Sequence, residues 1–395
     1  MLFAAGCGGG NNKTTTVGNN TITPPASSNN VVPIVVNAGP ASAPETNLAY
    51  VSVTVCVPGS ATNCQTIDNI QVDTGSEGLR ILSSVLTAPL PQQTDSSGNA
   101  IAECAQFADG YTWGPMAVAD VKLGGEQANS VPVQVIGGGS GNLTAVPSTC
   151  ANTGTAEDTV DALGANGILG IGPFRQDCGS GCGDTDLTKN PGFYYTCPSS
   201  GCTQAAVTLT QQSQNPVWMF PTDNNGTIIE LPAIASGGAA TVNGSLVFGI
   251  GTQANNSLGN ATVLILDNSG NFTTTFKGTP YTQSFLDSGS NALFFLDSAT
   301  TGIPECTSPN TGFYCPASPQ FLSAVDQGLN GTSATVNFSI VSANTLSATA
   351  NAFNNIGGPN PNSFDWGLPF FYGRNVFTGI EGQSTAVGVG PLFAF

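Results

Sequence analysis

The sequence predicts an all-β protein made of two related lobes. Short runs rich in β-branched and aromatic residues alternate with Gly, Pro and Asn, as in VVPIVV, YVSVTVCV, VPVQVI, SLVFGI and TVLIL. A second observation is a repeated pattern of apolar residue, Asp, hydroxyl residue, Gly and Ser, in VDTGSEGLRIL around Asp73 and LDSGSNALFFL around Asp287. Such a repeat predicts two half-structures that each contribute one copy. Helical periodicity is scarce, and a short helix is expected only in residues 320–328.

The first 45 residues are expected to lie outside the lobes. MLFAAGCGGG resembles the end of a bacterial lipoprotein signal peptide, so residues 1–7 are interpreted as its remnant and Cys7 as a candidate lipid anchor. Residues 8–45 are rich in Asn, Thr, Gly, Ser and Pro and are predicted to form a disordered tether. No later apolar run is long enough to cross a bilayer, so attachment to a membrane is expected through Cys7 only.

The rest of the chain divides into two lobes around the repeated motifs. The N-terminal β lobe is predicted to span residues 46–222 and to contain Asp73, and the C-terminal β lobe to span 223–395 and to contain Asp287. Each motif is followed by an apolar segment interrupted by Gly, ANGILGIGP at 165–173 and DWGLPFF at 365–371. The repeated downstream context favours duplication over two unrelated turn sequences.

The two Asp motifs together indicate a paired-carboxylate site. Each motif predicts a strand that runs into a tight turn, where Gly75 or Gly289 permits close backbone approach. Two adjacent carboxylates share one proton, so one is a base and the other an acid. Such a pair can activate water while polarising a peptide carbonyl, which is amide hydrolysis without a metal or cofactor.

These motifs and their spacing resemble the pepsin-like aspartic proteases, in a family of bacterial lipoproteins. The resemblance covers most of the chain after residue 46 and implies a bilobal fold with a central cleft. It implies that Asp73 and Asp287 form the catalytic dyad. It also implies that the following residues support the two catalytic loops: Thr74, Gly75, Ser76, Ser288, Gly289 and Ser290. Local turn capping is the alternative for the four hydroxyl groups.

The stretch expected to close over the substrate departs from the family pattern. The best match to the family's flap tyrosine is Tyr111, followed by Trp113, and either aromatic residue could instead pack within a sheet. Arg80 stands where the family has a Trp soon after the first Asp motif, and Leu368-Pro369 is also unusual. Arg80 could pair with a carboxylate or lie exposed on a strand.

Composition excludes several other chemistries. The chain has no His, which excludes Ser-His-Asp and Cys-His hydrolases and histidine-ligated zinc. With 7 Lys plus Arg and a net charge of −17, it offers no basic surface for nucleic acid. With the Asp pair as the reacting groups, we expect a monomer that acts on peptide or protein without a cofactor.

The cysteines indicate an oxidising compartment. Apart from Cys7, they are even in number and locally clustered, which predicts five disulfides whose connectivity the sequence does not specify. A four-thiolate zinc site at Cys178, Cys182, Cys197 and Cys202 is an alternative, and the nearby Asp177, Asp184 and Asp186 are weaker candidates for calcium. The disulfide candidates are Cys56, Cys64, Cys104, Cys150, Cys178, Cys182, Cys197, Cys202, Cys306 and Cys315.

Three functions follow, from different classes. The first is an aspartic endopeptidase tethered in the bacterial envelope, on the periplasmic or surface side. The second is a weak or inactive protein of the same fold that binds peptide or glycan. The third is a structural envelope lipoprotein. Both motifs with intact Asp favour the first, whereas the altered flap and Arg80 favour the second.

Overall fold

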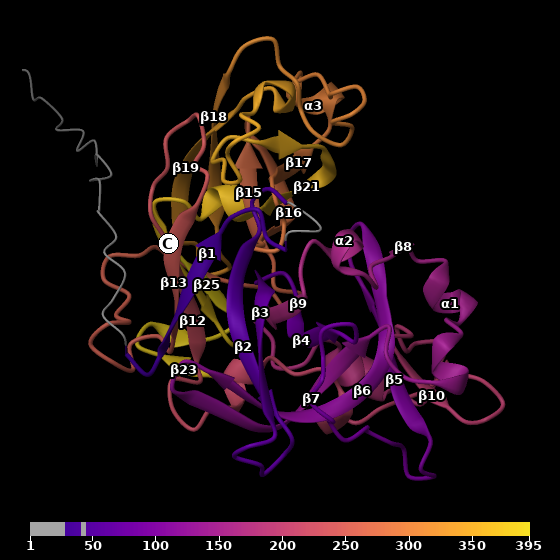
Figure 1. Ribbon diagram of the computed structural model, residues 1–395. Helices are drawn as coiled ribbons and strands as arrows, with labels where there is room; N and C mark the ends of the chain where they lie inside the picture. The colour runs from indigo at the N-terminus through magenta and orange to yellow at the C-terminus, as the bar shows by residue number, and fades with distance from the viewer. Residues whose placement is uncertain (1–27, 41–44) are drawn as a thin grey trace, which may run out of the picture.

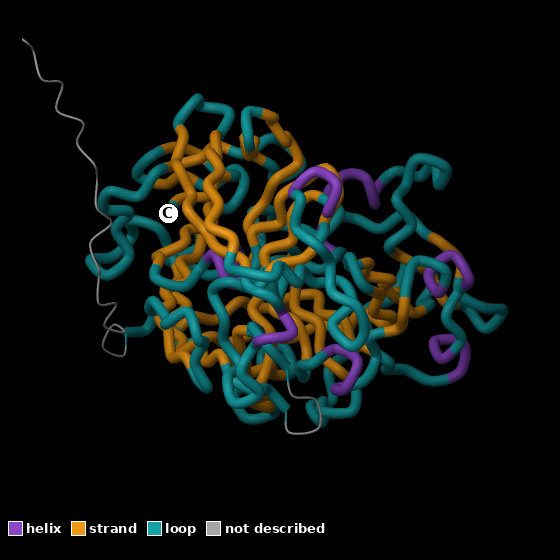
Figure 2. The backbone as a smooth tube through the Cα atoms, turned by 90° about the horizontal axis from the view of Figure 1, so that it is seen from above, coloured by secondary structure: helices purple, strands orange, loops and turns teal. Residues whose placement is uncertain are grey.

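The protein is built from β-sheets with only short helical turns between them, which confirms the predicted fold class. The computed structural model describes residues 28–40 and 45–395. Strands run through the body of the molecule in both views, joined by many loops (Figures 1 and 2). Each of the five runs predicted as strands overlaps an observed strand: VVPIVV, YVSVTVCV, VPVQVI, SLVFGI and TVLIL.

One large sheet contains the strands of the first half of the chain and several later ones. Its sixteen strands are β1 (Val31–Val36), β2 (Ala49–Cys56), β3 (Cys64–Asp73), β4 (Glu77–Leu82), β5 (Ala100–Gln106), β6 (Gly110–Leu123), β7 (Glu126–Ile136), β8 (Thr155–Ala156), β9 (Gly167–Ile171), β10 (Tyr194–Cys197), β11 (Thr203–Gln204), β12 (Gly226–Leu231), β13 (Val242–Phe248), β14 (Val263–Ile265), β22 (Arg374–Gly379) and β25 (Leu392–Ala394). They follow the order β11, β10, β5, β6, β7, β4, β9, β3, β2, β1, β13, β12, β22, β25, β14, with β8 beside β6.

The second sheet belongs to the later half of the chain. Its seven strands are β15 (Phe272–Phe276), β16 (Thr279–Leu286), β17 (Leu293–Leu296), β18 (Gln320–Gln327), β19 (Ser333–Ile340), β20 (Gly357–Gly358) and β21 (Asn360–Trp366). They follow the order β19, β18, β15, β16, β21, β17, β20. A separate hairpin consists of β23 (Ser384–Thr385) and β24 (Gly388–Val389).

The helical segments are short connections. The α-helical turns are α1 (Ser148–Ala151), α2 (Val160–Leu163) and α3 (Ser298–Thr301), and the 3₁₀ turns are η1 (Gly141–Thr144), η2 (Gly179–Gly183), η3 (Leu209–Gln211), η4 (Pro216–Met219), η5 (Ala343–Thr345) and η6 (Leu368–Phe370). In the part of the chain that the structure describes, no helix has the length and apolarity needed to cross a membrane.

Both sheets repeat one local arrangement, and this arrangement positions the Asp motifs. In the first, β9 lies between β3 and β4, parallel to β3 and antiparallel to β4. In the second, β21 lies between β16 and β17, again parallel to the first and antiparallel to the second. The loop joining the two outer strands therefore sits at the end of the central strand. Asp73 ends β3 and Asp287 directly follows β16, so each motif occupies such a loop.

The structure corrects two expectations about secondary structure. Residues 31–36 lie in the stretch predicted as a tether, yet they form β1, which is paired with β13 and β2. Along β1, buried side chains alternate with more exposed ones, and its β-branched residues favour pairing in a sheet. Residues 320–328 were predicted as a helix but form β18, because Ala324 and Asp326 point inward while their neighbours face solvent, a period of two.

Aromatic side chains form the core beneath the second Asp motif. The rings of Phe295 and Phe364 are stacked with centroids 5.3 Å apart, and Phe364 and Trp366 are also 5.3 Å apart. Phe338 meets Trp366 edge to face at 5.1 Å. Since Phe364 and Trp366 flank Asp365 on β21, this packing fixes the strand that supports the loop at Asp287.

Five disulfides staple neighbouring segments, which confirms the predicted number. The zinc alternative is wrong for the four candidate cysteines, because they are consumed in two of these bonds. Five disulfides indicate an oxidising, exported compartment. The pairs are Cys56–Cys64, Cys104–Cys150, Cys178–Cys182, Cys197–Cys202 and Cys306–Cys315.

Candidate active site

The first Asp motif holds its carboxylate with its own loop. The backbone N–H of Gly75 donates to Asp73 Oδ1 at 2.7 Å, and the hydroxyl of Ser76 donates to Asp73 Oδ2. The Asp73 residue is 6% exposed, whereas Gly75 is exposed. The carboxylate is thus fixed by two donors at a point that solvent reaches.

The second motif repeats these contacts. The backbone N–H of Gly289 donates to Asp287 Oδ1 at 2.7 Å, and Ser290 Oγ lies 2.9 Å from Asp287 Oδ2. Asp287 is half-buried. Equivalent atoms of the two loops therefore make equivalent hydrogen bonds, as expected for a duplicated half-structure.

The hydroxyl residues between Asp and Gly cross from one loop to the other. Ser288 Oγ accepts from the Thr74 N–H at 3.1 Å and donates to the Val72 carbonyl at 2.7 Å. In return, Thr74 Oγ1 accepts from the Ser288 N–H at 2.9 Å and donates to the Leu286 carbonyl at 3.1 Å. Both side chains are buried, so these four bonds fix the loops against each other.

The two glycines allow the carboxyl groups to come together. A Cβ atom placed on Gly75 would lie 2.6 Å from Asp287 Cγ, and one on Gly289 would lie 2.6 Å from Asp73 Oδ1. Neither space admits a side chain. Each loop therefore packs its backbone against the other motif's carboxyl group, which brings Asp73 and Asp287 side by side.

The electrostatics of this pair differ from those of two isolated carboxylates. Burial raises the pKa of Asp287 well above its usual range, and the charges of Asp73 and then Asp365 raise it further. The hydrogen bond from Ser290 opposes this shift. Two carboxyl groups in contact titrate as a unit, and the pair retains a proton at a pH at which free Asp is ionised.

The comparisons with known proteins bear on both the family and the fold. A family model described as "Protein of unknown function (DUF3443)" matches residues 26–395. The chain belongs to this family. No curated protein shows a significant match. Among solved structures, the aspartic proteinase from Irpex lacteus is similar, with a TM-score of 0.50 and 15% identity, over 92% of this chain and 96% of that chain. At this identity the similarity establishes the pepsin-like fold alone.

In this DUF3443 chain, two carboxyl groups that the sequence reasoning missed flank the pair. Asp365 Oδ2 lies 2.6 Å from Ser290 Oγ, the same hydroxyl that contacts Asp287. Glu77 follows Ser76, and its Oε1 accepts from the Phe174 N–H at 3.1 Å. An acidic residue inside each apolar flank, DWG and SEGLRIL, was the available signal.

Burial controls the titration of both flanking groups. It raises the pKa of Glu77 to about 8, with the Phe174 hydrogen bond opposing and the Asp73 charge adding to the shift. It also raises the pKa of Asp365 to about 8, against the hydrogen bond with Ser290 and with help from Asp73. The site therefore contains more carboxyl groups than the pair alone.

Arg80 lies inside the protein and not on an exposed strand. Its Nη2 is 2.6 Å from Glu103 Oε1 and 3.6 Å from Asp177 Oδ2, and Nη1 donates to the Glu77 carbonyl at 2.8 Å. Tyr194 donates to Asp177 Oδ1 at 2.8 Å. Arg80 is on β4 and Glu103 on β5, so this network ties the first Asp loop to the β5–β6 hairpin.

Asp177 is thus separated from the other acidic residues that were weaker candidates for calcium. It faces Arg80 in the interior, where burial and then the charge of Glu103 raise its pKa. Asp184 Oδ1 accepts from the Asp186 N–H at 2.9 Å, and Asp186 pairs with Lys189 at the surface. Among the described residues, no group of three or more acidic or cysteine side chains is placed to hold a metal ion.

The structure places the two flap candidates in a buried cluster. Tyr111 is 6% exposed and Trp113 is 4% exposed, and both pack near the Cys104–Cys150 disulfide and Tyr195. Trp113 donates from its indole N–H to the Leu143 carbonyl at 2.8 Å. The half-buried aromatic residue at the turn between β5 and β6 is Phe107, whose ring centroid lies 5.7 Å from the Arg80 guanidinium carbon.

The glycines of the downstream apolar segments pack against the Asp loops. A Cβ on Gly170 would lie 2.7 Å from the backbone carbon of Glu77, and one on Gly367 would lie 2.1 Å from the Ala292 carbonyl oxygen. The earlier glycine of the first segment, Gly167, instead meets the Arg80 carbonyl. Gly172 also packs against the first Asp loop, since a Cβ there would lie 2.9 Å from the Ser76 carbonyl oxygen and 3.0 Å from that of Thr74. Both Gly170 and Gly172 of GILGIG therefore permit this close approach.

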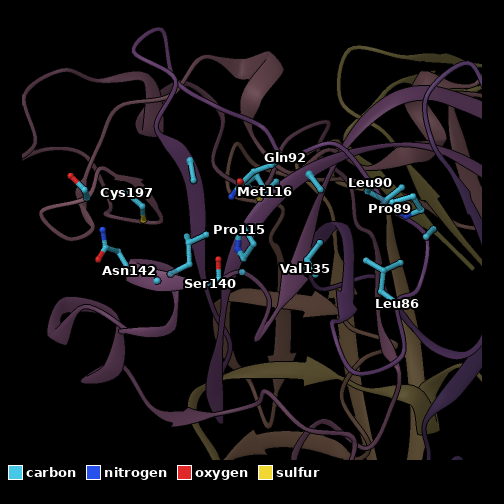
Figure 3. A pocket seen from close by; sticks show the side chains of 17 residues that line it. Leu86, Pro89, Leu90, Gln92, Pro115, Met116, Val135, Ser140, Asn142 and Cys197 are labelled. Carbon is cyan, nitrogen blue, oxygen red and sulfur yellow. The ribbon is translucent and has the colours of Figure 1, made fainter.

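A cavity of about 570 Å³ lies elsewhere in the first lobe (Figure 3). Its lining is mainly apolar and contains neither Asp73 nor Asp287, and it includes Leu86, Pro89, Leu90, Pro115, Met116 and Val135. None of the residues that line it carries a charge. Cys7 lies outside the described residues.

Proposed function

We propose that this chain is an aspartic endopeptidase. The observation that supports it most directly is the joint packing of the two Asp loops. Gly75 and Gly289 lie against the opposite carboxyl groups, while Thr74 and Ser288 lock the loops together. A turn that served only its own lobe would not need either feature. Both carboxyl groups are instead held in one place with matched donors.

The proposed reaction uses the protonation difference between the paired carboxyl groups. One ionised carboxylate takes a proton from a water molecule, which attacks the carbonyl carbon of a peptide bond. The protonated partner donates to the carbonyl oxygen, so that a tetrahedral intermediate forms. Transfer of a proton to the amide nitrogen then breaks the C–N bond. The substrate is a peptide or protein segment, and no cofactor takes part.

A second candidate is a protein of the same fold that binds peptide or glycan with little or no cleavage. Two features favour it: Arg80 stands where the pepsin-like proteases have a Trp, and both flap candidates are buried. Tyr111 and Trp113 pack within the first lobe, so neither offers an exposed ring to a substrate. The matched hydrogen bonds to both Asp side chains favour the enzyme, since binding alone does not need them.

The site of action is the bacterial envelope. The five disulfides support an exported location, and lipidation of Cys7 would hold the protein at a membrane surface as a monomer. Metabolic labelling with a fatty acid tests the anchor. Label should enter the wild type and be lost in Cys7→Ser, and equal labelling of both would contradict the anchor.

Cleavage of a mixed peptide library from pH 3 to 7 tests the proposed activity. We expect the wild type to cleave and Asp73→Asn and Asp287→Asn to lose cleavage, and a statine-type inhibitor to block the wild type. Asp326→Asn is a matched control, because this buried carboxyl group bonds Thr274 at 2.7 Å, away from the pair. A folded wild type that cleaves nothing at any pH would favour the binding function.

A further inference from the structure

Ser290 lies between two carboxyl groups. Its Oγ is 2.9 Å from Asp287 Oδ2 and 2.6 Å from Asp365 Oδ2. Asp365 comes from β21, the central strand of the second lobe's motif, and the residue is 8% exposed. Asp365, Ser290 and Asp287 therefore form a chain of side chains linked by two short oxygen–oxygen contacts.

The number of protons in this chain is constrained. A hydroxyl group has one proton and can donate it to only one of the two carboxyl groups. If both carboxyl groups were ionised, one of the two contacts would join a hydroxyl lone pair to a carboxylate oxygen with no proton between them. At least one of the carboxyl groups must therefore carry a proton to complete the chain.

The surroundings favour a proton on Asp365. Its Oδ1 is buried and has no hydrogen-bond partner, and no ion pair joins it to a basic side chain among the described residues. The neighbouring strand β17 has the sequence LFFL and offers no titratable group, and neither do the three residues of η6. The only titratable side chain on β16 is Tyr281. The charged groups facing Asp365 are the acidic Asp287 and Asp73.

We propose that Asp365 is a third carboxyl group of the active centre. It stays protonated during catalysis and donates a hydrogen bond to the Ser290 hydroxyl, so that Ser290 donates its own proton to Asp287. Asp365 acts through Ser290 and is a positioning residue. The proposal rests on the proposed peptidase function. The first lobe has no equivalent, because β9 carries the apolar Ile168 where β21 carries Asp365.

A protonated Asp365 has two effects on the pair. It removes a negative charge from beside Asp287, and a polarised Ser290 hydroxyl is a stronger donor to the ionised form of Asp287. Both effects lower the pH at which the pair loses its first proton. Loss of the donor should therefore move the acid limb of the pH–activity profile upward.

The test compares Asp365→Asn, Asp365→Leu and the control Asp326→Asn. The Asn amide can donate to Ser290 at every pH, whereas Leu cannot. We expect Asp365→Asn to keep kcat within about 3-fold and Asp365→Leu to lose about 10-fold in kcat with little change in KM. The acid limb should rise by about 0.5–1 pH unit in Asp365→Leu only. Equal losses in the two Asp365 variants, or an unmoved acid limb in Asp365→Leu, would overturn the proposal.

Infrared difference spectroscopy provides a readout that does not depend on cleavage. Other buried carboxyl groups such as Glu77 and Asp326 also contribute at pH 6, so the readout is the difference between the spectra of the folded wild type and Asp365→Asn, which should contain the carbonyl stretch of one protonated, buried carboxyl group. Absence of this difference would overturn the proposal. If the band is present while the wild type cleaves no peptide, the protonation of Asp365 stands and the peptidase function fails.

Discussion

Arg80 and Glu103 form a buried ion pair between the strand that follows the first Asp loop and the β5–β6 hairpin. The two groups are 2.6 Å apart, with side chains that are 3% and 0% exposed. Ser213 Oγ also donates to Glu103 Oε2 at 3.0 Å. A buried pair with additional hydrogen bonds is costly to break from one side, because the remaining charge is left without a partner.

We therefore expect Arg80→Ala to lower the free energy of unfolding by about 3–5 kcal/mol, measured by urea denaturation. Lys189→Ala is the matched control, because Lys189 pairs with Asp186 at an exposed site and its loss should leave stability almost unchanged. Equal effects of the two substitutions would contradict the structural role of Arg80.

The contacts between Thr74 and Ser288 predict energetic coupling. Thr74→Val and Ser288→Ala should each destabilise the protein by about 1–3 kcal/mol, since each leaves buried backbone groups without partners. A double-mutant cycle should give a coupling energy of about 0.5–3 kcal/mol. Strict additivity of the two substitutions would show that the loops are held together by other contacts.

The close approach of Gly75 predicts a loss of activity from a single methyl group. Gly75→Ala should reduce peptide cleavage by about 100-fold, because the new Cβ displaces the Asp287 carboxyl group. Gly237→Ala is the control, since no atom lies within 4 Å of its Cβ position. Full activity in a folded Gly75→Ala protein would disprove the proposed placement of the pair.

The buried acids predict that the protein is more stable in acid than at neutral pH. Folding raises the pKa of Glu77 and Asp365 to about 8 and that of Asp326 to about 7, each mainly through burial. A raised pKa contributes stability that is fully present below the unfolded value near 4 and is lost as pH rises through the folded value. Tm should fall from pH 4 to pH 8, and less steeply in Glu77→Gln. A Tm that rises over this range would contradict the prediction.

The disulfides should differ in their contribution according to the length of chain they close. Cys104 and Cys150 are 46 residues apart, and Cys178 and Cys182 are 4 apart. Replacing both cysteines of the longer loop by Ala should lower the free energy of unfolding by about 4 kcal/mol, whereas the same change in the shorter loop should lower it by about 2 kcal/mol. Thermal unfolding of the two double variants checks this order. A larger loss for the shorter loop would point to native-state contacts as the dominant factor.

The sequence predicted the features that depend on local pattern. The all-β class followed from short β-branched runs, and the two Asp loops followed from a repeated five-residue pattern. Both are properties of neighbouring residues. Glu77 and Asp365 were missed because their importance depends on which strands meet. Asp365 becomes part of the site only when β21 inserts beside β16, which brings its carboxyl group to Ser290.

The two corrections have a similar origin. Residues 320–328 contain good helix formers, but pairing with β15 and β19 determines their conformation. Residues 31–36 follow a long polar stretch and are flanked by Asn, yet β13 pairs with them across more than 200 residues of sequence. Long-range pairing of this kind cannot be recognised from the composition of one segment.

The position of β1 has a practical consequence for producing the protein. This strand lies between β2 and β13: all six of its residues pair with β13, and Val35 and Val36 also pair with β2. A chain shortened to begin at β2 would leave two unpaired strand edges facing each other in the sheet. Such edges recruit other chains, so the shortened protein should form oligomers or inclusion bodies, while one that keeps Val31–Val36 should stay soluble.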